Sequence, residues 1–96
     1  MLPLKFSEEA ETDIDQIAAY TLNVWGQRRL ARYANELDDG LERIQNNPHI
    51  GRKCDSIRHG FRRLEIGRHV VFYTIESDSI LIVRVLHRKM LPANYF

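Results

Sequence analysis

The spacing of apolar residues changes along this chain, and that change restricts its fold more than any other feature. Through the first half, apolar residues recur at steps of three and four, the spacing of one buried helix face. This spacing predicts a helix over about residues 8–25 and a second helix that ends near Asn46. The residues that carry it are Ala10, Ile14, Ile17, Ala18, Thr21, Val24 and Trp25, and then Leu30, Tyr33, Ala34, Leu37, Leu41 and Ile44.

Residues that favour helix ends flank both stretches. Ser7 suits an N-cap, and Gly26 suits the left-handed position that closes a helix. Pro48 ends the second helix, because the residue before a proline is pushed out of the helical region. The short connection between the helices predicts an antiparallel hairpin, whose apolar faces must be buried on a further layer. Trp25 ends the first stripe and is interpreted as a core anchor, with a recognition aromatic as the alternative.

The second half has the composition of strands. Segments 61–66, 69–75 and 80–86 are rich in Val, Ile, Phe and Tyr and are separated by short turns, which predicts an antiparallel meander. Residues 50–60 are polar and are expected to form a loop, and residues 2–6 suit a short first strand. The predicted fold is therefore α+β in the order β-α-α-β-β-β, with the helical hairpin on one face of a small antiparallel sheet and a single domain over residues 1–96.

The last two predicted strands are apolar at both odd and even positions. A sheet with one face in water alternates apolar and polar residues, and this one does not. The helices can cover only one face. We therefore expect a second cover, either a partner chain or the protein's own C-terminal tail, unless curvature of the small domain hides the remainder.

Charge is divided unevenly along the chain. Residues 1–50 carry a net charge of −4 and residues 51–96 a net charge of +5, within a total of +1. The asymmetry suggests that the C-terminal half meets an acidic partner, either nucleic acid or an acidic protein segment. The single cysteine, Cys54, rules out an internal disulfide, and no apolar run is long enough to span a membrane. The expected location is the cytoplasm.

Common catalytic signatures are missing from the sequence. The four histidines are spaced ten or more apart without paired cysteines, so no metal site is expected, and no motif indicates a cofactor. His87 suits either a hydrogen-bonded residue at the edge of the core or a proton-transfer group.

A basic group remains, from residues 62–68 and 84–89. Arg84 shares its parity with Ile82 and Leu86 and is expected on the face that the helices leave open, where an arginine is either solvated or bound to a carboxylate or phosphate. A two-residue turn at Gly67-Arg68 would place Arg62 beside Tyr73, whereas a slip of one residue would place Arg63 there.

Five phrases, in this order on these elements, resemble the ParE branch of the ParE/RelE toxin superfamily over nearly the whole chain. They are Ala10-x-x-Asp13-Ile14-x-x-Ile17-x-x-Tyr20, Pro48-His49-Ile50-Gly51, Gly60-Phe61-Arg62-Arg63, His69-Val70-Val71-Phe72-Tyr73 and Arg84-Val85-Leu86-His87-Arg88-Lys89-Met90. The resemblance implies the toxin of a type II toxin–antitoxin module, which traps cleaved complexes of DNA gyrase by binding and without catalysis. It also implies a cognate, ParD-like antitoxin that forms a hetero-oligomer with the toxin and is the only link to DNA.

The RelE-like branch gives an alternative, because its members cleave messenger RNA on the ribosome. On that interpretation Arg63 and Arg84 hold phosphate, while His87 and Tyr95 transfer protons. Val70 stands where that branch tends to place an arginine, and only Lys53 stands in place of a lysine cluster. A third alternative is a degenerate homologue that acts mainly as an antitoxin-bound co-repressor component.

The resemblance and the basic group together give a set of binding residues. An acidic, amphipathic antitoxin segment is expected to meet Arg84 and its basic neighbours, and to place apolar anchors on the open sheet face or in a helical groove. The residues expected to contact the target or the antitoxin are Arg62, Arg63, Tyr73, Arg84, His87, Arg88, Lys89 and Met90.

Overall fold

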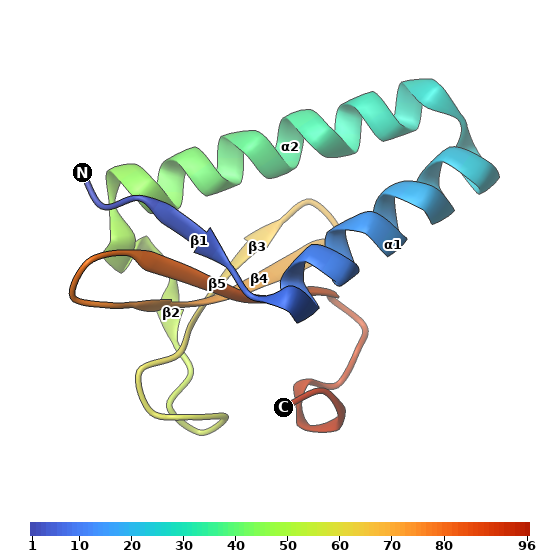
Figure 1. The fold of residues 1–96 in the computed structure, drawn as a ribbon. Helices are drawn as coiled ribbons and strands as arrows, with labels where there is room; N and C mark the ends of the chain where they lie inside the picture. The colour runs from blue at the N-terminus through green and yellow to red at the C-terminus, as the bar shows by residue number, and fades with distance from the viewer.

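The computed structural model, which describes residues 1–96, places a helical hairpin on one face of a five-stranded sheet (Figure 1). The elements are β1 (Leu4–Phe6), α1 (Glu8–Trp25), α2 (Gln27–Asn46), β2 (Arg52–Lys53), β3 (Arg62–Ile66), β4 (His69–Ile75) and β5 (Ile80–His87). Short 3-10 turns lie at Pro48–Ile50 and Pro92–Asn94. The predicted α+β class and the order of elements are confirmed, with β2 as an addition inside the segment that was expected to be a loop.

The helix ends follow the local signals in the sequence. The Ser7 hydroxyl accepts a hydrogen bond from the Ala10 amide at 3.0 Å and donates one to the Val83 carbonyl at 2.7 Å, so the N-cap also ties α1 to β5. Gly26 separates the two helices with a φ of 89°, a conformation that favours glycine. The second helix stops at Asn46, two residues before Pro48.

The sheet is mixed, which corrects the expectation of an antiparallel sheet. Its strand order is β1-β5-β4-β3-β2, and β1 runs parallel to β5, with Leu4 opposite Ile80. The other three pairs are antiparallel. A parallel pair needs a long crossover, and the two helices and three strands between β1 and β5 provide one.

The hairpin turn at Gly67-Arg68 sets the register, with Arg62 opposite Tyr73 and Arg63 opposite Phe72. A bulge then shifts the pairing of β4 with β5, because Phe72 lies opposite Arg84 while Tyr73 lies opposite Ile82. The predicted parity of β5 is therefore wrong for Ile82, which lies under the helices and does not share a face with Arg84. It is confirmed for Leu86, which lies with Arg84 on the opposite face, where Phe72 is their neighbour in β4.

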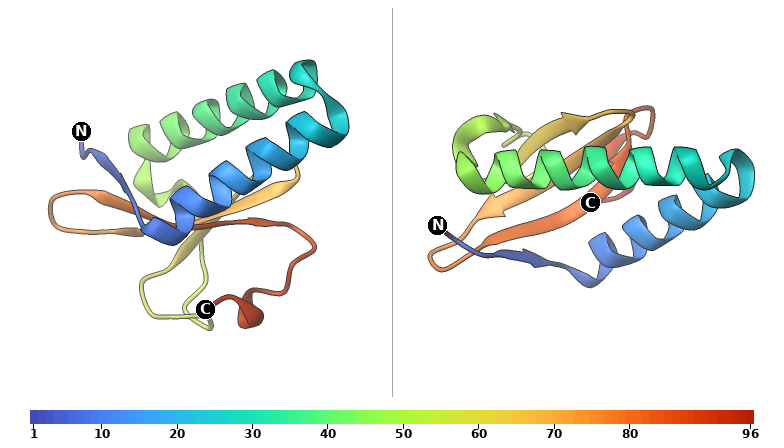
Figure 2. Two further views of the ribbon diagram at one scale, coloured as in Figure 1. Left: turned by 45° about the vertical axis from the view of Figure 1, so that its right-hand side comes forward. Right: turned by 90° about the horizontal axis from the view of Figure 1, so that it is seen from above.

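The two faces of the sheet carry two apolar clusters. The larger cluster lies under the helices and includes Leu37, Leu41, Val71, Tyr73 and Ile82. The smaller cluster lies on the opposite face and consists of Cys54, Phe61, Val70, Phe72 and Leu86, with Ile57, Met90 and Phe96 packed against it. The loop before β3 and the C-terminal tail lie on this second face (Figure 2). The chain's own tail thus supplies much of the second cover.

The hairpin extends beyond the sheet at its tip, where α1 meets α2 (Figures 1 and 2). Side chains that the helical spacing assigns to a buried stripe are therefore exposed there. Trp25 is 55% exposed, so the interpretation of Trp25 as a core anchor is wrong. The helical period identifies a face, but it does not tell where the supporting sheet ends. Neither helix is long and apolar enough to cross a membrane.

Candidate functional site

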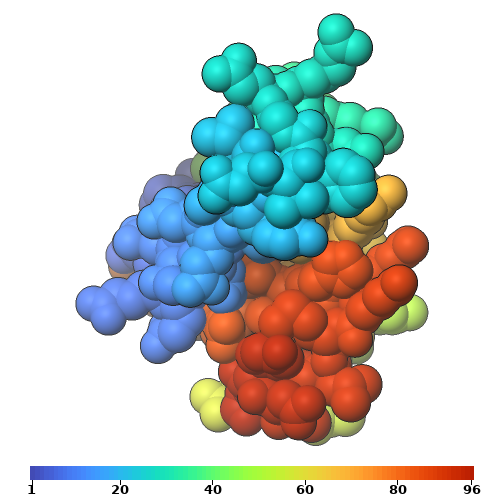
Figure 3. All heavy atoms as spheres, turned by 90° about the vertical axis from the view of Figure 1, so that its right-hand side faces the viewer, coloured from blue at the N-terminus to red at the C-terminus, as the bar shows by residue number.

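A groove of about 440 Å³ lies between the helical hairpin and the end of the sheet that carries the β3–β4 turn. In Figure 3 the hairpin, blue to teal, lies above the orange and red residues of β5 and the tail, and the groove runs where they meet. The residues that line it are Asp13, Gln16, Ile17, Tyr20, Thr21, Trp25, Arg29, Arg32, Tyr33, Glu36, Gly67, Arg68, His69, Val85, His87 and Met90.

Aromatic side chains dominate the outer part of this groove. Tyr20 is 62% exposed, and the Arg29 guanidinium lies 5.0 Å from the centre of the Trp25 ring. Exposed Trp, Tyr and Arg side chains are the residues that most often contribute large binding energies at protein interfaces. The chemistry of the outer groove therefore suits a macromolecular partner.

Two histidines face each other across β4 and β5 at the inner end of the groove. The rings of His69 and His87 are 5.5 Å apart in an edge-to-face arrangement, and the Tyr33 ring lies 5.4 Å from His69. Burial, and then the neighbouring His87, lower the pKa of His69. Burial, with a smaller contribution from Asp13, raises the pKa of Tyr33 to about 12. Both shifts favour the neutral forms of His69 and Tyr33, whose rings line the inner groove.

Some of the arginines that line the groove have an ion-pair partner and others have none. Arg32 forms an ion pair with Glu36 at 3.1 Å, one helical turn away. Arg29 and Arg68 form no ion pair with a carboxylate, although both line the groove. A partner that brought carboxylates to these two arginines would meet complementary charge.

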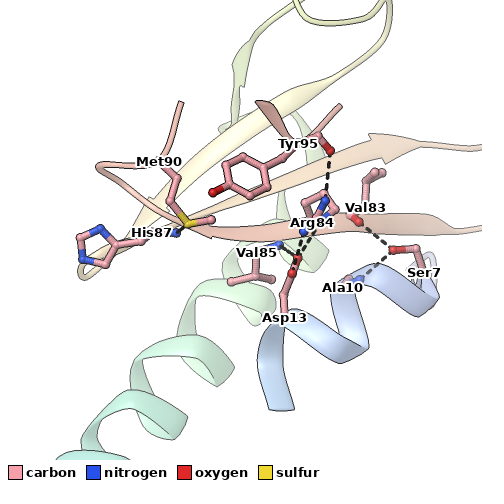
Figure 4. A network of polar contacts seen from close by, with 9 residues as sticks. All are labelled: Ser7, Ala10, Asp13, Val83, Arg84, Val85, His87, Met90 and Tyr95. Carbon is pink, nitrogen blue, oxygen red and sulfur yellow. Dashed lines mark hydrogen bonds and ion pairs between the residues drawn. The ribbon is translucent and has the colours of Figure 1, made fainter. Parts of the chain in front are cut away.

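A largely buried ion pair joins Asp13, which lines the groove, to Arg84 beside it (Figure 4). Nε and Nη2 of Arg84 donate to the two carboxylate oxygens of Asp13, each at 2.8 Å, and the Val85 amide donates to the same carboxylate at 3.0 Å. The side chains of Arg84 and Asp13 are 19% and 10% exposed. The hydrogen bond to Asp13, followed by its charge, raises the pKa of Arg84. Arg84 thus receives its carboxylate from this chain's own α1.

Arg84 also holds the C-terminal tail. Its Nη1 donates to the Tyr95 carbonyl at 3.0 Å, and its guanidinium lies 5.7 Å from the centre of the Tyr95 ring. The Phe96 ring meets Phe72 edge to face at 5.0 Å and Phe61 at 5.4 Å. Beyond the Arg88 amide, which donates to the Arg68 carbonyl at 2.9 Å, the tail is held through side chains and the Tyr95 carbonyl, without any strand pairing.

The residues predicted as binding residues fall into separate places. His87 and Met90 line the groove, and Arg88 and Lys89 are exposed just beyond β5. Arg63 lies on the opposite face, with its guanidinium 5.5 Å from the centre of the Phe72 ring.

Two predicted binding residues have structural roles instead. Tyr73 is fully buried, and its hydroxyl donates to the Pro48 carbonyl at 2.6 Å and accepts from the Gly51 amide at 2.8 Å, so the expectation that it contacts a partner is wrong. Arg62 donates to the Gly51 carbonyl at 2.8 Å. Together they fix the turn that follows α2.

Three of the four groups expected for a ribonuclease share the tail-covered face, because Arg63 and Arg84 both lie opposite Phe72 and Tyr95 binds Arg84. His87 is apart from them. Arg63 belongs to the tail-covered face, whereas His87 lies at the groove beside His69. Arg84 and Tyr95 are bonded to each other, and Arg84 is saturated further by Asp13.

Four residues that line the groove were not predicted as binding residues from the sequence, namely Asp13, Tyr33, Glu36 and His69. Asp13 had a detectable signal, because it lies three residues after Ala10 and four before Ile17, where a carboxylate interrupts an apolar helical stripe. The other three carried no comparable signal, since the groove joins elements that are distant in the sequence.

Residues 4–92 match a family model described as the ParE toxin of the type II toxin–antitoxin system, parDE. Among relatives, Toxin ParE1 of Caulobacter vibrioides is 39% identical over 90 residues, which cover 94% of this chain and 93% of that protein. Toxin ParE1 of Mycobacterium tuberculosis is 38% identical over 85 residues, covering 88% and 87% of the two chains.

Solved structures share the fold at lower identity. A chain of the chromosomal ParDE TA system from P. aeruginosa is similar with a TM-score of 0.76 at 19% identity, and the match covers 91% of this chain and 96% of that one. A chain of the YoeB dimer from Staphylococcus aureus is similar with a TM-score of 0.65 at 22% identity, covering 91% and 97%.

Proposed function

Because this chain belongs to the ParE toxin family of type II toxin–antitoxin systems, we propose that it inhibits DNA gyrase by binding, and that its cognate antitoxin neutralises it from the groove. Toxin action follows from membership of the family. The gyrase target follows from the resemblance to the ParE branch rather than from any contact described above. A gyrase inhibitor acts where the chromosome is, which agrees with a cytoplasmic location.

The groove is the observation that carries the antitoxin part of the proposal. It combines exposed aromatic rings, an inner end lined by the rings of Tyr33, His69 and His87, and two arginines without carboxylate partners. An amphipathic segment that places apolar side chains against Trp25 and Met90, and carboxylates near Arg29 and Arg68, would satisfy all three features. This chemistry agrees with the acidic, amphipathic antitoxin that the sequence predicts, but it moves the expected charge contacts from Arg84 to Arg29 and Arg68.

The separation of His87 from the other three ribonuclease groups, and the pairing of Arg84 with Asp13, favour binding over catalysis. General acid–base catalysis requires its groups within hydrogen-bond reach of one reacting centre. Here Arg63 and His87 lie on different faces of the sheet, and Arg84 is already bonded to Asp13. We therefore keep cleavage of messenger RNA as the alternative that the first experiment must test.

The decisive experiment uses the purified chain, freed of antitoxin, in two assays side by side. One assay measures supercoiling and DNA cleavage by gyrase, and the other measures ribosome-dependent cleavage of messenger RNA. We expect cleaved, gyrase-linked DNA to accumulate while the messenger stays intact, and we expect added antitoxin to abolish the effect. Messenger cleavage with unaffected supercoiling would overturn the proposal in favour of the RelE-type activity.

A further inference from the structure

The groove and the C-terminal tail share residues, although they lie on different sides of the sheet. Met90 lines the groove and also packs against the smaller apolar cluster under the tail. Asp13 lines the groove and binds Arg84, which in turn binds the Tyr95 carbonyl. A partner that fills the groove therefore contacts Met90 and Asp13, one residue of each of the two connections that hold the tail.

The first connection is the turn that directs the chain from β5 into the tail. The Met90 amide donates to the His87 carbonyl at 2.8 Å, and the His87 amide approaches the Met90 sulfur at 3.2 Å. The Lys89 amide donates to Nδ1 of His87 at 3.1 Å. His87 and Met90 thus form one unit, and Figure 4 shows their side chains together at the end of β5. An apolar side chain in the groove would press on this unit from one side while the smaller cluster supports it from the other.

The second connection is the chain of polar contacts from α1 to the tail. It runs from the Asp13 carboxylate through the Arg84 guanidinium to the Tyr95 carbonyl (Figure 4). A partner that covers Asp13 and Arg84 would remove the remaining water from this pair, and that strengthens its electrostatic attraction.

The tail itself is weakly attached. No strand pairs with residues 88–96, and Leu91 is 67% exposed. The attachments are the Arg88 amide on the Arg68 carbonyl, Met90, the ring of Phe96 and the contacts of Tyr95 with Arg84. Segments with few buried contacts open locally far more often than the core unfolds. Opening would uncover Phe61, Phe72 and the neighbouring Arg63 on the second face of the sheet.

We propose that occupancy of the groove locks the tail in the closed position, so that the antitoxin controls access to the second face of the sheet without touching that face. This inference rests on the proposed antitoxin site and adds a means of regulation to it. The free chain samples open tails, and the bound chain does not. The coupling passes through Met90 and through the Asp13–Arg84 pair.

The test is hydrogen–deuterium exchange of the tail, residues 88–96, in the free chain and in its complex with the cognate antitoxin. The Arg88 amide, which donates to the Arg68 carbonyl, reports the attachment of the tail to the β3–β4 turn. The Met90 amide donates to the His87 carbonyl, and the Asn94 and Tyr95 amides donate to the Leu91 and Pro92 carbonyls, so these three report the turns of the closed tail. We expect their exchange to slow on the order of tenfold in the complex. The Glu76 amide, in the β4–β5 turn, is the internal reference for general stabilisation and should change much less.

Three variants separate coupling from ordinary stabilisation. Met90→Ala removes the shared side chain and is compared at saturating antitoxin, because Met90 also lines the groove and its loss weakens binding. With the groove filled, tail exchange in this variant should no longer slow beyond the Glu76 reference. Met90→Leu restores the packing volume and should restore the slowing, while Leu91→Ala, at an exposed neighbour, should behave like the unmodified chain.

The outcomes distinguish failure of the coupling from failure of the antitoxin site. Tail exchange that is unchanged by antitoxin, or slowed equally in Met90→Ala, would overturn the coupling. Antitoxin binding that leaves the exchange of groove segments in α1 and α2 unchanged would instead overturn the groove as the antitoxin site, and the coupling with it.

Discussion

The Asp13 carboxylate serves Arg84 and the Val85 amide at once, so it has the largest expected effect among single residues. Breaking a largely buried ion pair leaves the partner charge without compensation. We expect Asp13→Asn to lower the free energy of unfolding by about 3 kcal/mol. Asp15→Asn, at an exposed site on the same helix, should change it by no more than about 0.5 kcal/mol. Urea denaturation of both variants measures the difference, and equal losses would contradict the assigned role.

His69 gives the fold a dependence on pH. Because burial and His87 lower its pKa in the folded chain, the unfolded chain binds a proton first as the pH falls. The stabilisation is therefore present above the unfolded pKa of about 6.5 and decreases as the pH falls from there towards the folded pKa. His69→Gln should flatten this slope in urea melts recorded across that range. His59→Gln, at an exposed histidine, should retain it, and a slope that survives in His69→Gln would contradict the assignment.

Single residues were predictable from the sequence where their partners are close along the chain. Ser7, Gly26 and Pro48 mark the helix ends because each acts within one turn of its own position. Arg84 was expected to seek a carboxylate, yet its partner lies 71 residues away and no local pattern joins the two. Trp25 was wrongly predicted to be buried, although it fits the apolar stripe of its helix. The sheet does not extend under the tip of the hairpin, so nothing covers this side chain.

At the scale of elements, α2 depends on a close contact with β3. A Cβ atom added at Gly40 would overlap the Ile66 side chain, approaching its Cγ1 to 2.6 Å. Helix propensity alone favours Gly→Ala by about 1 kcal/mol, but overpacking at this contact should reverse the sign. We expect Gly40→Ala to destabilise the chain by about 1–3 kcal/mol in urea denaturation. Asn35→Ala, exposed on the same helix, should be neutral or slightly stabilising, and a more stable Gly40→Ala variant would refute the contact.

The elements themselves were predictable, but their pairing was only partly so. Long periodic stretches define α1 and α2, and β-rich runs bounded by turns define β3, β4 and β5. The parallel pairing of β1 with β5 could not be predicted from the sequence. A strand of three residues is too short for its pattern to indicate which distant strand it pairs with, or in which direction. The two-residue β2 and the bulge opposite Phe72 depend on contacts between distant parts of the chain. The local amino-acid composition therefore does not reveal them.

At the scale of the whole molecule, the groove exists because the hairpin is longer than the sheet that supports it. Residues at the tip can therefore change binding without changing stability. We expect Trp25→Ala to alter the free energy of unfolding by less than about 0.5 kcal/mol. The same variant should weaken antitoxin binding by about 10–100-fold, as loss of an interface tryptophan does. Isothermal titration calorimetry measures the binding.

Leu22→Ala is the matched control, because Leu22 is exposed on the same helix but does not line the groove. It should bind antitoxin as the unmodified chain does. Equal weakening in both variants would indicate that the partner covers the tip from outside, and unchanged binding in Trp25→Ala would exclude the outer groove.

The open edge of β5 has a consequence for how the protein behaves among its own copies. Beyond β1, where another strand could add to the sheet, Ser7 takes the Val83 carbonyl and Asp13 takes the Val85 amide. A free edge of this kind is a template for self-association, and short polar side chains from the neighbouring helix occupy it here. Asp13 therefore blocks edge-to-edge aggregation of the free chain, because the Val85 amide is no longer available to pair with a strand of another copy.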